Sequence, residues 1–568
     1  MGSKHNDSYD FAGDYNLNGI ILQAHDGTGG IFGEGGVDIM EQVQELNVYE
    51  GITQTAVYGT LVMVDSTNII GNLPIQGTER LFFKLSTPGS SNIAHVIDAS
   101  EQTGHPFHVY KVSNKQQAKQ GTLVYTLHFA SREFMRNIRT KVSQAYSGKL
   151  SDMVAQICGD KEGLDTRKQL YIEETRNQDK FVMPNVSPFK AIEMIAKKAL
   201  PKYGQGVGYY FYETTKGFYF QSWENMCATS YKEKAAVETY YYQPRNITDN
   251  DSEEDKLLQD LKSVESYRFI NNFHDVAAAQ ALGTYGSKVI SYNIYDKTYI
   301  ESDYHYHDHF GKRIHVDYAD GDGFGAQNPQ ISSNPVDFDS NRNGSGKGVS
   351  DYPDSMVSLS PTTQYLHDEP TGSYGVEAQL DGIFDGIRNG ARQEINAGTT
   401  LEMTVPGQSF IQPGEVIHFE LRPVDQEGLT PDGKQYDPQY SGRYMITKIR
   451  HRVTKQDYKM VFECKKDSLR ERLPGQGGYK MPVGSTVGKF STLIHDKMPV
   501  PKILNDFNNH VNKYGAVISS HLATVKGKAN SIIRTGESYR NKAGSIRNKA
   551  NEIKAKVNRL RKFKNRFF

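Results

Sequence analysis

The chain has 568 residues, more than one hydrophobic core usually organises, and its 66 Lys and Arg balance 66 Asp and Glu to a formal net charge of zero. Its three cysteines, Cys158, Cys227 and Cys464, lie far apart in sequence, which excludes a disulfide framework and a cysteine-based zinc module and favours reduced thiols. No run of 18 or more apolar residues occurs and the first ten residues are polar, so we expect neither a membrane span nor a signal peptide.

We expect a polar N-terminal arm at residues 1–14 and a first β domain at residues 15–131. Runs of β-branched and aromatic residues are separated there by Gly, Pro and Asn, as in an antiparallel sheet or barrel. The composition agrees, because 35 Tyr and 52 Gly favour strands and turns over a helical bundle. The clearest predicted strands are residues 56–64, 80–85, 107–112 and 123–129.

A small α+β insert is predicted at residues 132–245. It begins with a helical section at residues 132–158. A second helix is marked by Ser187 as N-cap and by Pro188 at the first helical position, with apolar residues at core spacing after them. These apolar residues are Ala191, Ile192, Ile195, Ala199 and Leu200. Residues 208–220 then predict a hairpin with a Gly-containing turn.

A second β domain is predicted in two pieces. Residues 246–316 hold an acidic connector and then strand-like sequence, and residues 396–469 hold the remaining strands. Between them we expect a loop-rich insertion at residues 317–395, because residues 317–362 are rich in Gly, Asp, Asn, Ser and Pro. Residues 470–510 are rich in Gly, Pro and Lys and predict a linker. The strands of the second piece are predicted at residues 400–405, 416–421, 444–452 and 458–464.

The last segment, residues 511–568, carries an apolar or small residue every three or four positions, which predicts a helical tail with a heptad seam. In the register that places Leu522 at position a, the other a positions are mainly small, which allows close approach of helices. Helix packing is predicted through the large apolar residues Ile518, Leu522, Val525, Ile532, Tyr539, Ile546, Ile553 and Leu560.

This tail is also strongly basic, with 15 Lys and Arg against 2 Asp and Glu, so it carries +13 and the rest of the chain carries −13. A parallel homo-oligomer would place like charges opposite each other, so we expect the tail to need an anionic partner. Nucleic acid, an acidic protein wall and a membrane surface are the candidates, and packing along the chain's own acidic body is the alternative. The basic flanking residues are Lys526, Lys528, Arg540, Lys542, Arg547, Lys549, Lys554, Lys556 and Arg561.

A group of histidines is the one candidate metal site. His305, His307 and His309 alternate, so on a strand all three would project from one face, and imidazoles at that spacing could bind zinc or nickel. The alternative, which we favour, is a polar face of a strand or loop, because no general-base Glu follows in a zincin pattern. No nucleophile elbow, His-Glu-x-x-His or phosphate-binding loop occurs, so we expect neither catalysis nor a cofactor.

Several short blocks, taken in order over residues 15–470, resemble one family, the central baseplate hub proteins of contractile, T4-like phage tails. Blocks that resemble its first tube-like domain are residues 64–66, 69–79, 107–112 and 127–133. Residues 183–192, leading into the hairpin, look like its inserted α+β domain. Blocks that resemble its second tube domain are residues 404–407, 412–416, 441–447 and 466–468. The spike-hub protein of type VI secretion is similar in fold, but no spike-like repeat follows residue 470 here.

The resemblance implies an α+β, predominantly β fold with two tube-protein-like antiparallel β-barrel domains, the α+β insert, the loop-rich insertion and the helical tail. It implies a homotrimer whose six tube-like domains form a ring between the hexameric tail tube and the trimeric central spike. Expected partners are therefore the tail tube or a tube-initiator protein and the spike, with the tape-measure protein or DNA as candidates for the basic tail, and no membrane.

The expected location is the baseplate of the virion, after assembly in the host cytoplasm. Two alternatives stay open at this point. One is a metal-dependent cell-wall hydrolase of the tail that uses His305, His307 and His309. The other is the hub of a type VI secretion system or of a related injection system.

Overall fold

The structure is a computed structural model in which all described residues lie within one compact unit, Met1–Asp496. The heptad residues and basic residues predicted in the tail lie outside the described residues. Among the helices described, none combines the length and apolar character that a membrane crossing needs. The described residues are 10–27, 35–73, 75–88, 96–100, 105–202, 208–233, 237–242, 253–271, 275–293, 297–317, 351–361, 395, 398–423 and 436–471.

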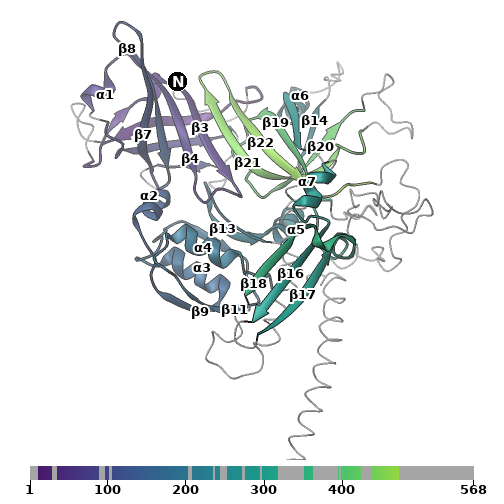
Figure 1. The fold of residues 1–568 in the computed structure, drawn as a ribbon. Coiled ribbons are helices and arrows are strands. Elements are labelled where there is room, and N and C mark those ends of the chain that lie inside the picture. The colour runs from purple at the N-terminus through teal and green to yellow at the C-terminus, as the bar shows by residue number, and fades with distance from the viewer. Residues whose placement is uncertain are drawn as a thin grey trace, which may run out of the picture. The chain divides into compact units, whose positions relative to one another are not determined.

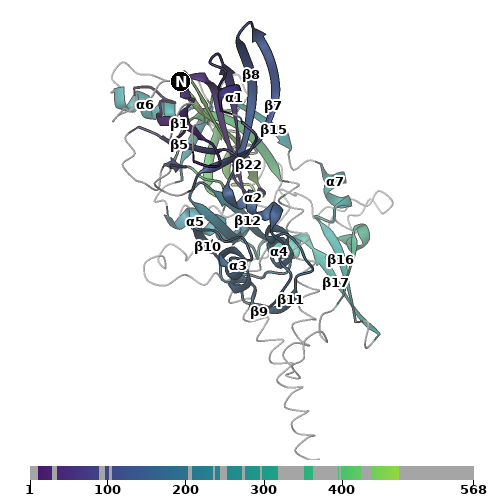
Figure 2. The same cartoon turned by 90° about the vertical axis from the view of Figure 1, so that its left-hand side faces the viewer.

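The first β region is an antiparallel sheet with the order β3-β4-β8-β7-β5-β1-β2, and β6 pairs with β5. The four predicted strands are confirmed as β4, β5, β7 and β8. Figure 2 shows that β7 and β8 extend together as a long ribbon. The elements of this region are β1 (Asn16–Gln23), β2 (Val37–Asp38), η2 (Met40–Gln42), β3 (Val43–Gly51), β4 (Tyr58–Asp65), α1 (Ile69–Asn72), β5 (Arg80–Ser86), β6 (Ile97–Asp98), β7 (Phe107–Lys119) and β8 (Thr122–Ala130).

The second β region has the strand order β15-β19-β22-β21, with β20 on β21 and β14 parallel to β20. All four strands predicted in its second piece are confirmed as β19, β20, β21 and β22. An isolated bridge joins Tyr241 of β14 to Ser263, just before β15. The strands are β14 (Thr239–Tyr242), β15 (Ser266–Asn271), β19 (Thr399–Pro406), β20 (Val416–Leu421), β21 (Gly442–Thr454) and β22 (Tyr458–Lys466).

The two β regions form one sheet of fourteen described strands, because β3 of the first pairs with β21 of the second (Figure 1). One apolar core runs through both regions, with Leu46 and Leu127 from the first and Ile449 and Phe462 from the second all fully buried. Buried side chains alternate with more exposed ones along β4 and β22, as expected of strands that cover a core with one face. The predominantly β fold is thereby confirmed.

The insert contains two helices that pack together, α3 and α4, beside the hairpin of β12 and β13 (Figure 2). Ser187 and Pro188 stand at the N-cap and first helical position of α4, as predicted. The hairpin is also confirmed. The elements are α2 (Arg132–Arg139), β9 (Ala145–Lys149), α3 (Leu150–Gly159), β10 (Gln169–Ile172), β11 (Gln178–Val182), α4 (Pro188–Ala196), β12 (Tyr209–Thr214), β13 (Gly217–Ser222) and α5 (Trp223–Glu233).

The predicted helical section at residues 132–158 was wrong in its middle, because β9 separates α2 from α3. Residues 140–149 include Thr140, Val142 and Gly148, which are poor helix formers, and Gly148 has a φ of +127°. β9 gains its hydrogen bonds from β11, which lies some thirty residues later. A prediction from the spacing of neighbouring residues cannot include β11, so it misses β9.

A separate three-stranded sheet has the order β17-β16-β18. It includes β18, which lies in the stretch predicted as loops and is held by parallel pairing with β16. Residues 253–256, the described part of the predicted acidic connector, belong to α6. The domain boundaries stay a prediction. The elements here are α6 (Glu253–Leu261), α7 (Val276–Ala281), β16 (Gly286–Asn293), β17 (Thr298–His305), α8 (Tyr306–Phe310), η5 (Pro353–Ser355) and β18 (Val357–Pro361).

Candidate functional site: the junction of the β regions and the insert

The two β regions meet where β3 pairs with β21. Seven antiparallel residue pairs join them, from Lys448 with Gly51 to Thr454 with Glu45. One edge of β21 pairs first with β20 and then with β3, while its other edge pairs with β22. This seam therefore lies inside a continuous sheet and is held by main-chain hydrogen bonds.

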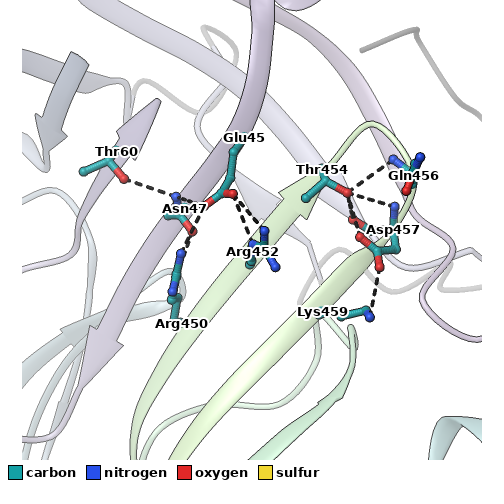
Figure 3. A network of polar contacts seen from close by, with 9 residues as sticks. All are labelled: Glu45, Asn47, Thr60, Arg450, Arg452, Thr454, Gln456, Asp457 and Lys459. Atoms are coloured by element: carbon teal, nitrogen blue, oxygen red, sulfur yellow. Dashed lines mark hydrogen bonds and ion pairs between the residues drawn. The ribbon is translucent and has the colours of Figure 1, made fainter. Parts of the chain in front are cut away.

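Figure 3 shows the more exposed face of the seam, where Arg450 and Arg452 of β21 converge on Glu45 of β3. Their Nη2 atoms lie 3.0 and 3.1 Å from the Glu45 carboxylate oxygens, and Asn47 donates to Glu45 at 2.9 Å. Partial burial opposes ionisation, but hydrogen bonds from Asn47 and Arg452 and the charges of both arginines hold the pKa of Glu45 below its ordinary value. A slip of one residue would move both arginines to the other face, so these contacts fix the register.

The buried face of the seam carries Glu50 and His451, each 1% exposed. The Glu50 Oε1 atom lies 3.7 Å from His451 Nε2, and His451 Nδ1 lies 2.7 Å from the Tyr458 hydroxyl. Burial lowers the pKa of His451 to about 3, so this ring is neutral. Burial also raises the pKa of Glu50 to about 7, against hydrogen bonds from Thr215 that favour its ionised form. Thr215 belongs to the turn of the β12–β13 hairpin, so the insert reaches the seam here.

A second buried carboxylate, Glu213 on β12, fixes the insert to the first β region. The Val57 N–H donates to it at 2.9 Å, and the Ser131 hydroxyl donates at 2.6 Å. Val57 immediately precedes β4 and Ser131 immediately follows β8, so one side chain holds the entry and the exit of two neighbouring strands. Lys168 forms an ion pair with Glu213 and lies 3.9 Å from Glu133.

Charge balance in this cluster depends on Lys168. Burial acts to lower the pKa of Lys168, but the carboxylates of Glu213 and Glu133 outweigh burial and raise this pKa above its ordinary value. Burial raises the pKa of Glu213, and Lys168 opposes that effect. A buried charge is tolerated when it is paired and hydrogen-bonded, as both groups are here.

A third buried carboxylate, Asp467, follows β22. It accepts hydrogen bonds from Trp223 Nε1 at 3.0 Å and from the Val316 N–H at 3.1 Å, and its Oδ2 atom lies 3.1 Å from His315 Nδ1. The other ring nitrogen of His315 lies 2.9 Å from the Phe310 carbonyl oxygen. Both ring nitrogens therefore face oxygen atoms, and the ring bridges Asp467 and the Phe310 carbonyl group.

Asp467 therefore ties together the insert, the segment after α8 and the end of the second β region. Burial opposes ionisation of Asp467, but the charge and hydrogen bond of His315 hold its pKa below the ordinary value. Next to it, buried Lys466 donates to the Ser441 carbonyl at 2.7 Å and lies 3.6 Å from Asp317.

The predicted histidine group does not have the predicted geometry. His305 ends β17, whereas His307 and His309 lie in the short helix α8, so the three do not share one face of a strand. Burial lowers the pKa of His309 to about 4. Within the described ranges, no three His, Cys, Asp or Glu side chains gather in a way that could hold a metal ion.

None of the buried charged residues at the junction was predicted. One local signal was available, because Glu213 interrupts an otherwise aromatic run that includes Tyr209, Phe211 and Tyr212. A carboxylate on such a strand needs a buried partner. Asp467 and His315 gave no comparable signal, because Asp467 stands in polar sequence and its contact with His315 spans more than 150 residues.

No family model and no curated protein matches the chain. Among solved structures, the tail protein from Neisseria meningitidis MC58 is similar over 80% of this chain and 98% of its own, with 10% identity and a TM-score of 0.41. The 43 kDa tail protein of prophage MuSo2 from Shewanella oneidensis is similar over 79% and 99%, with 10% identity and a TM-score of 0.42. The E. coli c3393 protein, a component of the type VI secretion system, is similar over 78% and 76%, with 8% identity and a TM-score of 0.32.

Replacement of Glu50 by Gln should remove a pH dependence of stability. A carboxyl group whose pKa is raised on folding binds more protons in the folded state, so stability is lost as pH rises from the ordinary Glu pKa to about 7. Between pH 5 and 8, urea unfolding of the unmodified chain should lose about 3 kcal/mol relative to Glu50→Gln. The matched control is Glu41→Gln at an exposed position. Parallel pH profiles for the chain and Glu50→Gln would contradict the assignment.

Replacement of Glu213 by Leu should cost about 3–5 kcal/mol of unfolding free energy, because it leaves Lys168 charged and buried. The double variant Glu213→Leu with Lys168→Met should recover part of this loss. Glu193→Leu, which removes an exposed carboxylate paired with Lys190, should change stability by about 0.5 kcal/mol or less. A double variant as unstable as the single one would argue against a paired buried charge.

Trp223 is the only tryptophan of the chain, so its fluorescence reports on Asp467. In His315→Gln, the pKa of Asp467 should rise, and the acid transition of Trp223 emission should move to higher pH. His418→Gln, whose ring lies beside Glu420 on β20, is the control. An unchanged acid transition in His315→Gln would show that His315 does not lower the pKa of Asp467.

Proposed function

We propose that the chain is a structural component of a contractile phage-tail baseplate, a trimeric hub that adapts the hexameric tail tube to the trimeric central spike. The ordered blocks of similar sequence over residues 15–470 support this function. The observation that carries it is the seam between β3 and β21, which makes one sheet out of two β regions of a single chain.

The seam supports a change of symmetry between the tail tube and the spike. A chain that presents two tube-like β domains gives six of them in a trimer, so a three-fold assembly can meet a six-fold neighbour. Contacts between unlike surfaces close into a ring when the rotation permits. The bridge from Tyr241 to Ser263 supports closure of the second β region into a barrel, since it brings β14 toward β15.

The hub function assigns no catalysis and no cofactor to the chain. The buried polar groups Glu50, Glu213 and Asp467 hold parts of the chain together, and each contacts protein groups. We propose that the partners are the tail tube or a tube-initiator protein and the spike, within the virion. The basic residues 511–568 would contact the tape-measure protein or DNA, and a peptide of that tail should then bind with an affinity that falls as salt rises.

The mass of the purified chain tests the hub directly. Light scattering after size exclusion should give about 190 kDa, three times the chain mass of 63.9 kDa. Truncation at Pro501 should keep the trimer but impair tail assembly or DNA retention.

A monomeric chain would overturn the hub, and normal particles from the truncated chain would overturn the function of the tail. Metal bound to the purified protein together with lysis in a zymogram would favour the hydrolase alternative at His305, His307 and His309. A hub of a type VI secretion or related injection system would give the same trimer but would assemble with a secretion tube.

A further inference from the structure

The three-stranded sheet β17-β16-β18 leaves one apolar face exposed. Tyr299, Val357 and Leu359 are 66%, 49% and 70% exposed, and Tyr292 and Ile290 lie beside them in the register of the strands. The opposite face is covered, since Val289 and Tyr304 are 1% exposed. Sheets with parallel pairs such as β16 and β18 are usually covered on both faces. We call the open side, defined by these five residues, the sheet face.

Charged residues share the same side of the sheet and border the sheet face, since the register pairs Glu301 with Ile290 and Asp303 with Lys288. Glu301, Asp303 and Asp354 all lie within 4.0 Å of the single Lys288 amino group. Three carboxylates thus share one cation, which leaves a net charge of −2 at this border. A surface that covers the sheet face should therefore be apolar in its centre and basic at its rim.

The same chain carries such a surface on the ribbon of β9 and β11 in the insert. The register pairs Val182 with Ala145 and Lys180 with Ser147, and these four side chains are exposed on one side of the ribbon. Val182 is 76% exposed, the most exposed large apolar residue among those described. Lys180 forms no ion pair with any described residue. We call this side, defined by these four residues, the ribbon face.

We propose that the sheet face of one copy packs against the ribbon face of a second copy. Val182 and Ala145 would cover Leu359 and Val357, and Lys180 would reach the carboxylate border, in a sheet-on-sheet contact about 10 Å thick. The two faces differ, so the contact is heterologous and each copy keeps one free face of each kind until a ring closes. This inference rests on the trimer of the proposed function, and it names a surface that the trimer uses.

Cross-linking between two single-cysteine variants tests the contact in the full chain. Val182→Cys and Leu359→Cys are co-expressed in one host, one with a size tag, purified together, and treated with a bis-maleimide whose spacer is about 10 Å. The native cysteines Cys158, Cys227 and Cys464 are buried and should stay unreactive. The two variants then assemble into the same particles, and a cross-link of mixed size joins two copies.

The co-expressed pair should give at least about tenfold more mixed-size product than Val182→Cys co-expressed with Ile270→Cys, since a specific contact holds the two thiols within reach. Ile270 is 52% exposed on β15 and belongs to neither face. Lys180→Glu in the first partner should lower the yield about threefold or more at low salt, and Asp303→Lys in the second should restore it.

The mass of the same samples separates this inference from the hub function. A trimer with no more Val182–Leu359 product than the control would overturn the contact and leave the hub standing. A chain that stays monomeric at all concentrations would overturn both. Equal yields with and without Lys180→Glu would remove the charge argument and with it the assignment of the ribbon face.

Discussion

The antiparallel pairing of β3 with β21 is the constraint on which the other contacts depend. It joins residues about 400 positions apart. The chain between β3 and β21, which includes the insert and the three-stranded sheet, must therefore start and end at two neighbouring strands. Closing such a loop costs entropy that grows only slowly with its length. The hydrogen bonds of the seam and the shared apolar core offset that entropy cost. A single sheet can therefore form although long segments are inserted between its strands.

Buried polar groups at the junction specify geometry more than they add stability. A paired buried charge gains little over an apolar pair of the same volume, because removing both charges from water costs several kcal/mol. Glu213 nevertheless satisfies the Val57 N–H, the Ser131 hydroxyl and the Lys168 ammonium at once. An apolar side chain could fill this space, but it would fix no orientation of the insert against β4 and β8. The same reasoning applies to Asp467, which holds Trp223 and His315 from two other parts of the chain.

The elements predicted correctly are those that depend on interactions between residues close in sequence. Runs of β-branched and aromatic residues predicted β4, β5 and β8, and Ser187 with Pro188 predicted the start of α4, because propensity and capping act within a few residues. β9 and β18 were missed because their hydrogen bonds come from β11 and β16, so tertiary pairing decides their structure. His305, His307 and His309 alternate in sequence and would share one face on a strand, but the backbone turns from β17 into α8 at Tyr306 and the alternation ends there.

The buried contacts couple the insert to both β regions. Thr215 in the turn of the β12–β13 hairpin contacts Glu50 on β3, and Glu213 in the same hairpin holds the residues that flank β4 and β8. These three strands are neighbours in the order β3-β4-β8, and β3 pairs with β21 on its other edge. A force on the insert therefore enters the sheet through three adjacent strands and passes across the seam through main-chain hydrogen bonds that share the load. An insert attached by one flexible linker could not couple to both β regions in this way.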